Sequence, residues 1–180
     1  FSQGMTYSFE SPKVFDKLLL PKDAPERQAI QISNPLGEDY SIMRTISLNG
    51  MLTSLATNYN RRNKDVRLYE LGNIYLPKSL PLTELPEERM QFTLGMYGEG
   101  DFFSMKGVVE EFFEKIGMRK KEQYDPNAGK SFLHPGRQAN IVYEGTVVGY
   151  LGEVHPEVAD NYGIGGRAYV AVIDMPEVVA

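Results

Sequence analysis

The sequence predicts an α+β fold, in which a mainly antiparallel sheet is flanked by helices. Short apolar segments of strand length recur along the chain, and several follow one another with only a turn between them. Amphipathic patterns at helical spacing separate the others. Because 180 residues fit one domain, we expect residues 1–180 to form a single domain.

The first half of the chain is expected to alternate between strands and helices. The expected elements are a strand at 1–9, a short helix at 11–21, a strand at 28–35, a helix at 49–62 and a strand at 66–76. Ser11 and Asn49 are residue types that cap helix N-termini, so we expect each to begin a helix. Gly72 interrupts the last strand, which favours a bulge there.

The second half follows a proline-rich loop at 76–89. The expected elements are a strand at 90–98, a helix at 104–117, strands at 138–145 and 146–155, a short helix at 156–163 and a strand at 167–175. Ser104 and Gly117 are placed to open and close the longer helix. Glu144-Gly145 is a hairpin signal, which predicts that the two strands around it pair directly.

Composition excludes several classes of function. The chain has no cysteine, so it has neither disulfides nor thiolate metal sites. No apolar run reaches membrane-spanning length, and we expect a cytoplasmic protein. The net charge of −5 argues against a free-standing nucleic-acid binder. Basic runs at 60–67 and 118–121 are expected to be solvated helix ends.

The two histidines, His134 and His155, are each followed directly by proline. A zinc site would need further ligands such as Glu153, and the spacing fits no ligand signature. His155-Pro156 is typical of a junction between a strand and a helix. His134, Pro135 and Gly136 indicate a turn into the next strand. We therefore assign no metal ligand.

No catalytic residue is assigned either. No serine lies in a nucleophile elbow, and the glycines at 163–166 lack the lysine of a phosphate-binding loop. Arg44 and Arg137 lie among turn signals beside apolar segments. Arginine is suited to bidentate or interface pairing, but an ordinary surface role for both remains open.

Five stretches, in order, resemble the beta subunit of bacterial-type phenylalanyl-tRNA synthetases. They are NPLGEDYSIMRTISLNGML, RLYELGNIYL, DFFSMKGVVEEFFEKIG, FLHPGRQANI and GYLGEVHPEV. The resemblance covers nearly the whole chain and implies the class II synthetase fold. It also implies that residues 1–180 are a fragment of a longer beta subunit.

The resemblance further implies that this domain is not catalytic. The related catalytic alpha subunit carries arginines that hold ATP phosphates in its second signature motif. The matching positions here are Asn73, Leu76 and Pro77, none of which is cationic. An apolar side chain cannot stabilise the charge of adenylyl transfer. We expect no cofactor in this domain, with ATP and Mg²⁺ confined to the holoenzyme.

By this resemblance the domain pairs with the alpha subunit in a heterotetramer, and meets tRNA(Phe) through the holoenzyme. Helix 49–62 would stand at the interface, and we expect a larger exposed apolar area than a monomer normally shows. A small, wholly polar surface around this helix would count against the placement. The structural or interface candidates are Arg44, Asn49, Leu52, Tyr59, His134, Pro135, Gly136, Arg137, His155 and Pro156. The alternative is residual nucleotide, amino-acid or tRNA binding, the last through Arg61, Arg62, Lys64 and Arg67.

Overall fold

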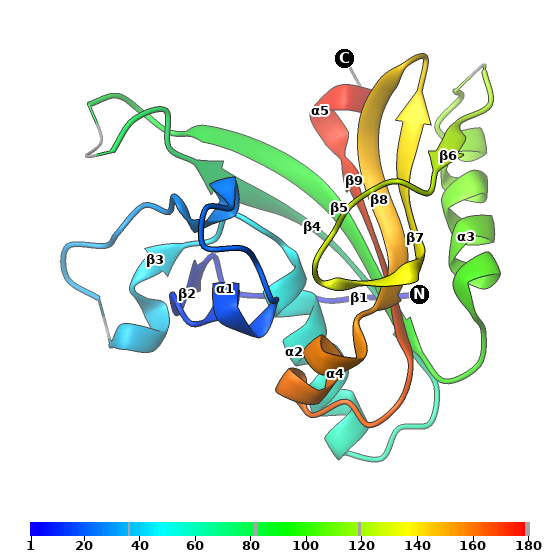
Figure 1. The fold of residues 1–180 in the computed structure, drawn as a ribbon, viewed down its shortest axis with the longest axis horizontal. Helices are drawn as coiled ribbons and strands as arrows, with labels where there is room; N and C mark the ends of the chain where they lie inside the picture. Colours follow the sequence, from blue (N-terminus) through cyan, green and yellow to red (C-terminus); the bar gives the residue numbers. More distant parts are fainter. Residues whose placement is uncertain (36, 81–82, 119, 179–180) are drawn as a thin grey trace.

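The computed structural model describes residues 1–35, 37–80, 83–118 and 120–178. A seven-stranded sheet crosses the molecule (Figure 1). In spatial order its strands are β1 (Ser2–Gln3), β4 (Val66–Leu76), β5 (Glu87–Tyr97), β9 (Ala168–Asp174), β8 (Thr146–Val154), β7 (Leu133–Tyr143) and β6 (Gln123–Asp125). Every neighbouring pair is antiparallel except β1 and β4, which confirms the predicted mainly antiparallel sheet.

A second, two-stranded sheet and several helices complete the described part of the chain. The small sheet pairs β2 (Phe9–Glu10) with β3 (Ile42–Met43). The α-helices are α1 (Val14–Lys17), α2 (Leu48–Asn60), α3 (Phe102–Lys115), α4 (Pro156–Tyr162) and α5 (Met175–Val178). Single 3₁₀ turns are formed by η1 (Pro25–Arg27) and η2 (Glu38–Tyr40).

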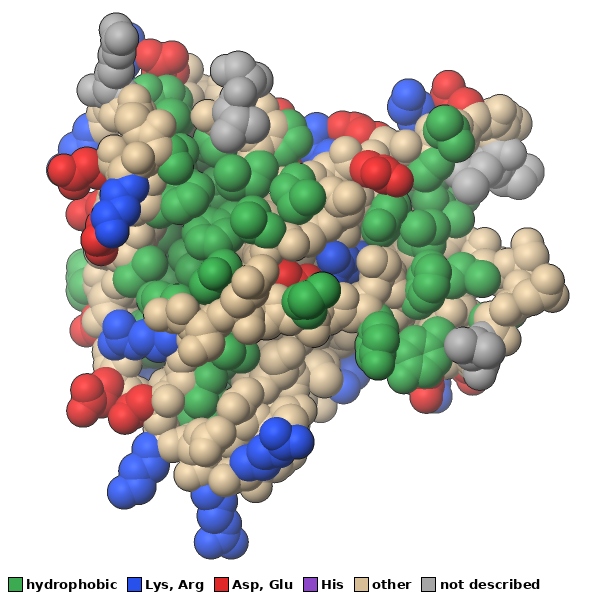
Figure 2. All heavy atoms as spheres, turned by 180° about the vertical axis from the view of Figure 1, so that it is seen from behind, with side chains coloured by type: hydrophobic (Ala, Val, Ile, Leu, Met, Phe, Trp, Pro, Cys, Tyr) green, Lys and Arg blue, Asp and Glu red, His purple; other side chains and the backbone are tan. Residues whose placement is uncertain are grey.

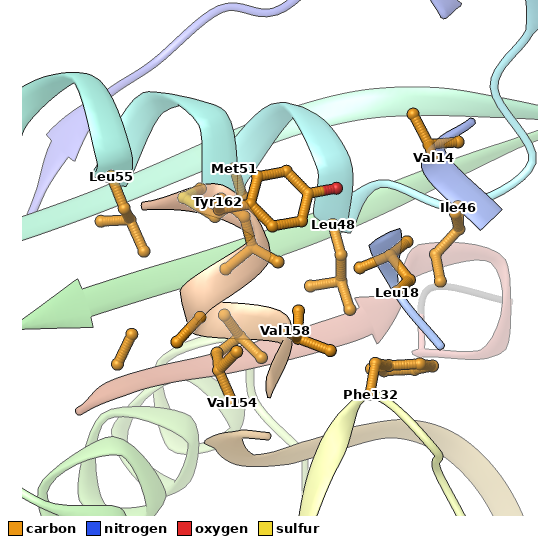
Figure 3. Close-up of a cluster of buried hydrophobic side chains, with 14 of the residues drawn as sticks. Val14, Leu18, Ile46, Leu48, Met51, Leu55, Phe132, Val154, Val158 and Tyr162 are labelled. Atoms are coloured by element: carbon orange, nitrogen blue, oxygen red, sulfur yellow. The ribbon is translucent and has the colours of Figure 1, made fainter. Parts of the chain in front are cut away.

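The helices cover both faces of the large sheet (Figure 1). Because side chains alternate along a strand, β9 supplies both cores. Val170 and Val172 face α1, α2 and α4 in the first apolar cluster. Ala171 and Ile173 face α3 in the second. Figure 3 shows the first cluster, where side chains of α1, α2 and α4 meet those of the sheet.

Local signals predicted the later elements well. Strand β4 has the predicted bounds, and α4 ends at Gly163, whose φ is 78°. The β7–β8 hairpin turns at Glu144 and Gly145, with φ of 49° and 82°. Two successive positive φ angles match the twist of the flanking strands, as in a type I′ turn. The predicted hairpin is confirmed.

The N-terminal third differs from the prediction. In place of one strand at 1–9, the chain forms two separate two-residue strands, β1 and β2, and the second includes Glu10. The segment at 28–35 is not a strand, and only Gln31 forms an isolated bridge, to Ile42. Its partner β3 is two residues long, because the turn η2 immediately precedes it, so no longer ladder can form. Helix α1 begins at Val14 after Lys13, and not at Ser11.

Two helix starts also differ from the prediction. Ser47 stands at the N-cap of α2, and Asn49 lies inside the first turn. Helix α3 begins at Phe102 because Asp101 caps it, and Ser104 is the reciprocal member of a capping box. Both errors have one cause, since several polar residues compete near each start. Gly117, with a φ of 80°, follows the end of α3 as predicted.

Candidate functional site

Strand β4 carries Asn73 and Leu76, two of the three positions at which the resemblance implies lost arginines, and Pro77 directly follows it. At one of them, Asn73, the backbone carbonyl accepts a hydrogen bond of 2.6 Å from Arg44 Nε. Arg44 Nη1 also donates to Glu70 Oε1 at 3.1 Å and to Thr6 Oγ1 at 3.0 Å. The side chain of Arg44 is 4% exposed. The arginine that reaches this strand is therefore buried and already bonded within the protein.

The space that this network occupies explains why residue 72 is a glycine. The ladder between β4 and β5 runs in continuous register from Val66 to Leu76, so the predicted bulge is wrong. A Cβ at Gly72 would collide with the Arg44 guanidinium and lie 2.8 Å from Glu70 Oε1. The glycine therefore makes room for the buried ion pair instead of breaking the strand.

The segments around the two histidines supply part of the first apolar cluster. Phe132 and Leu133 at the start of β7, and Val154 at the end of β8, are buried in this cluster. Leu18, just after α1, and Leu48 of α2 are buried in the same cluster (Figure 3). Apolar side chains therefore fill the space between these helices and the sheet, and we call this space the filled pocket.

Each histidine accepts a hydrogen bond from the backbone N–H two residues further along the chain. His155 is the N-cap of α4, and its Nδ1 accepts the Glu157 N–H at 3.1 Å. The predicted junction with Pro156 is therefore confirmed. His134 Nδ1 accepts the Gly136 N–H at 3.0 Å, in an irregular stretch of β7 between Leu133 and Gln138. The predicted turn is thus a distortion inside a strand that begins at Leu133.

No metal centre emerges from the part of the chain that the structure describes. Within it, no three His, Asp or Glu side chains come together as a metal site would require. Among its helices, none combines the length and apolarity of a membrane crossing.

A second buried polar group lies beside the Arg44 network. Asn49 Nδ2 donates to Glu10 Oε1 at 3.4 Å, and Tyr162 donates to Asn49 Oδ1 at 2.6 Å. The other oxygen of Glu10 is buried without a hydrogen-bond partner. Burial raises the pKa of Glu10 to about 7, although Arg44 and Asn49 act to lower it. Asn49 thus links two segments through its side chain.

The outer face of α2 is largely polar. Thr53 and Thr57 are exposed, whereas Leu52 is buried in the core. Tyr59 is exposed and makes an edge contact with Tyr97, with ring centroids 5.7 Å apart. The surface around α2 is therefore not wholly polar, and its place at an interface stays a prediction.

Large exposed apolar side chains gather instead on the N-terminal segment. Met5 is 90% exposed and Tyr7 is 76% exposed, and Phe9 and Tyr40 are also exposed. The Tyr7 and Tyr40 rings meet edge to face at 5.9 Å, over a cleft of about 500 Å³ that Ile32 and Pro35 also line. We call these six residues the N-terminal apolar surface. Figure 2 shows one group of hydrophobic side chains on the side of the molecule where β2 and β3 lie.

Arg137 belongs to a cluster on the opposite face of the sheet, beside α3. Arg137 Nη1 and Arg167 Nε lie 3.6 Å and 3.8 Å from the same oxygen of Glu153. Tyr169 donates to that oxygen at 3.4 Å. Sequence reasoning considered Glu153 only as a metal ligand and did not select Arg167. A charged residue inside the apolar strand at 146–154 was the available signal.

The basic residues at 60–67 do not form one continuous surface. Arg62 and Lys64 line a cleft of about 790 Å³ beside Tyr97 and Arg167. Arg67 lies over the Phe1 ring, with its guanidinium carbon 5.9 Å from the ring centroid. In the second run, 118–121, residue 119 lies outside the described residues.

The overall fold shows which class of protein the chain resembles. The structure of pyrrolysyl-tRNA synthetase from Desulfitobacterium hafniense has a TM-score of 0.78 to this chain, covering 99% of it and 62% of that chain. At 13% identity, this likeness shows the fold alone. The chain therefore has the fold of an aminoacyl-tRNA synthetase.

Its family follows from sequence. Residues 1–175 match the phenylalanyl tRNA synthetase beta chain CLM domain, and the chain belongs to this family. The phenylalanine–tRNA ligase beta subunit of Clostridium acetobutylicum is 46% identical over 174 residues, which are 97% of this chain and 22% of that protein. The phenylalanine–tRNA ligase beta subunit of Clostridium tetani is 43% identical over 174 residues, which are again 97% of this chain and 22% of that protein. The chain thus spans 22% of the length of these two relatives.

Proposed function

We propose that this domain is a non-catalytic, class II synthetase-like scaffold of a phenylalanine–tRNA ligase beta subunit, which pairs with a catalytic alpha subunit. The chemistry around β4 is the observation that carries the proposal. Asn73, Leu76 and Pro77 bring no cation to the end of this strand. The arginine that reaches the strand, Arg44, is buried and bonded to Glu70, so it is not free to bind a substrate.

ATP with Mg²⁺ does not fit the residues around β4. The phosphates of a nucleotide need cationic partners at the transferring group. Asn73, Leu76 and Pro77 supply none, and Arg44 is buried against Glu70. We therefore assign ATP, Mg²⁺, phenylalanine and tRNA(Phe) to the holoenzyme, a cytoplasmic heterotetramer of two alpha and two beta chains. This geometry gives no support for residual nucleotide or amino-acid binding around β4.

The N-terminal apolar surface is the best candidate for contact with the alpha subunit. Exposed patches of large apolar and aromatic side chains are typical of interfaces. Tyr7 and Tyr40 stand at its centre, and tyrosine is enriched among residues that dominate binding energy. The polar outer face of α2 lacks this character.

Phenylalanine-dependent exchange of pyrophosphate into ATP tests the proposal. It is measured with the full-length beta chain alone, with the alpha subunit alone and with the two mixed. We expect no exchange from the beta chain alone, and an increase over the alpha subunit only on mixing. Exchange by the beta chain alone would mean that a catalytic site exists outside the filled pocket.

A further inference from the structure

A cleft of about 520 Å³ lies on the α3 side of the sheet, away from the filled pocket. We call it the α3 cleft. Four segments supply its walls: the N-terminal end of α3, the end of β6, the strand β7 and the start of β9. The lining side chains that matter here are Phe102, Phe103, Lys106, Arg137, Arg167 and Tyr169.

A buried carboxylate positions two arginines at this cleft. The side chain of Glu153 is 4% exposed, and one of its oxygens faces Arg137, Arg167 and Tyr169. The two guanidinium groups lie at 3.6 Å and 3.8 Å from that oxygen, beyond normal hydrogen-bond length. Glu153 therefore holds them in place electrostatically without using up their N–H donors.

Both arginines face solvent through the cleft. The side chain of Arg137 is 42% exposed and that of Arg167 is 69% exposed. His134 Nε2 lies 3.3 Å from Arg137 Nη1 and further limits how this arginine can move. The guanidinium groups of Arg137 on β7 and Arg167 just before β9 thus converge on one open volume.

The side chains that line the α3 cleft favour an anion. Lys106 is a third cation, with its Nζ 4.8 Å from the centroid of the Tyr124 ring and 3.8 Å from Glu110 Oε1 outside the lining. Asp101, the carboxylate that lines the cleft, accepts hydrogen bonds from the Ser104 backbone N–H and hydroxyl as the cap of α3. The lining therefore holds three cations and one carboxylate.

The shape of the donors favours phosphate. Guanidinium groups bind phosphate oxygens with pairs of parallel hydrogen bonds, and a phosphate has enough oxygens to engage two of them at once. Phe102 and Phe103 offer aromatic surface beside the arginines, and Phe103 is largely exposed. Such rings stack on nucleobases regardless of base identity.

We propose that the α3 cleft binds a phosphate group through Arg137 and Arg167, with Glu153 as the residue that positions them. The ligand is a phosphate carried by a nucleoside, either a free nucleotide or a nucleotide within a nucleic-acid chain. This site is independent of the proposed scaffold function, because it lies on the other face of the sheet from the filled pocket.

Isothermal titration calorimetry on the full-length beta chain tests the site. The probes are inorganic phosphate, uridine 5′-monophosphate, uridine without phosphate, and a short oligouridylate. The variants are Arg167→Gln, which leaves Arg137 to neutralise Glu153, and the triple variant R137Q/E153Q/R167Q, which leaves no buried charge unpaired. Lys115→Gln is the matched control, since Lys115 is an exposed cation on α3 that pairs with Glu111.

We expect binding of uridine monophosphate or oligouridylate that is roughly tenfold weaker in R167Q, the effect of losing one charge-assisted contact. It should be lost in the triple variant and unchanged in K115Q. Binding of the mononucleotide identifies a free nucleotide as the source, and binding of the oligonucleotide alone identifies a nucleic-acid chain. If neither phosphorylated probe binds, or if the folded triple variant binds as well as the wild type, the proposal is wrong.

Discussion

Arg44 Nη1 lies 3.1 Å from Glu70 Oε1, and this ion pair joins the N-terminal segment to the central sheet. Thr6 from the N-terminal segment donates to both oxygens of Glu70, at 2.9 Å and 2.8 Å, and accepts from Arg44. Glu70 lies on β4, the strand that also carries Asn73 and Leu76. A cation is thus still present at β4, but it serves the fold.

Removing one partner of this pair should strongly destabilise the domain. Arg44→Ala leaves Glu70 without its cation, which typically costs about 3–5 kcal/mol for a buried pair. The double variant R44M/E70L should recover much of that loss, because no unpaired charge remains. Urea unfolding measures both, with Lys115→Ala as an exposed control expected to change stability by less than about 1 kcal/mol. Equal effects of R44A and K115A would contradict the structural role.

Glycine substitutions test whether Gly72 is required by packing. Gly72→Ala places a Cβ against the Arg44 guanidinium and Glu70, and overpacking of this kind costs about 1–3 kcal/mol. Gly107→Ala is the matched control, because its Cβ would enter open space within α3. There, alanine should stabilise by about 0.5–1 kcal/mol through helix propensity. Thermal unfolding should show opposite signs, and a neutral G72A would mean that the network yields easily.

Local signals explain which elements could be predicted. Strand β4 follows from the periodicity of its apolar residues. Helix α4 follows from its start signal at His155-Pro156 and its stop signal at Gly163, which lie within a few residues of the helix ends. The hairpin at Glu144-Gly145 is of the same kind. The fold class therefore follows from short-range physics, with the relative arrangement of strands supported by their direct connections.

What could not be predicted depends on contacts between distant segments. Asn49 has the composition of a cap, yet its amide is used by Glu10 and Tyr162, which are 39 and 113 residues away. Arg137 and Arg167 meet at Glu153 only after three segments of chain are brought together. No local sequence pattern predicts such contacts between distant segments, so Arg167 and Tyr169 were not selected from the sequence.

Stability should decrease as pH rises through the titration of Glu10. Burial raises its pKa from the ordinary 4.5 to about 7, so between these values the folded state holds a proton that the unfolded state has lost. The penalty is absent below about pH 4.5 and reaches about 3 kcal/mol above pH 7. Glu10→Gln should remove it, so its stability relative to the wild type should grow with pH. Urea unfolding from pH 4 to 8 measures this difference, and a flat difference would contradict it.

Substitutions in the N-terminal apolar surface should weaken assembly with the alpha subunit. Tyr7→Ser and Tyr40→Ser each remove a large aromatic contact area, and losses at such central positions often reach about 2 kcal/mol or more. Because both tyrosines are exposed in this chain, we expect little change in the stability of the unpartnered beta chain. Thr57→Ala on the outer face of α2 is the control, because Thr57 is exposed away from this surface, and it should bind as the wild type does. Sedimentation of full-length beta chains mixed with the alpha subunit gives the affinities. Weakening by T57A and not by the tyrosine variants would return the interface to α2.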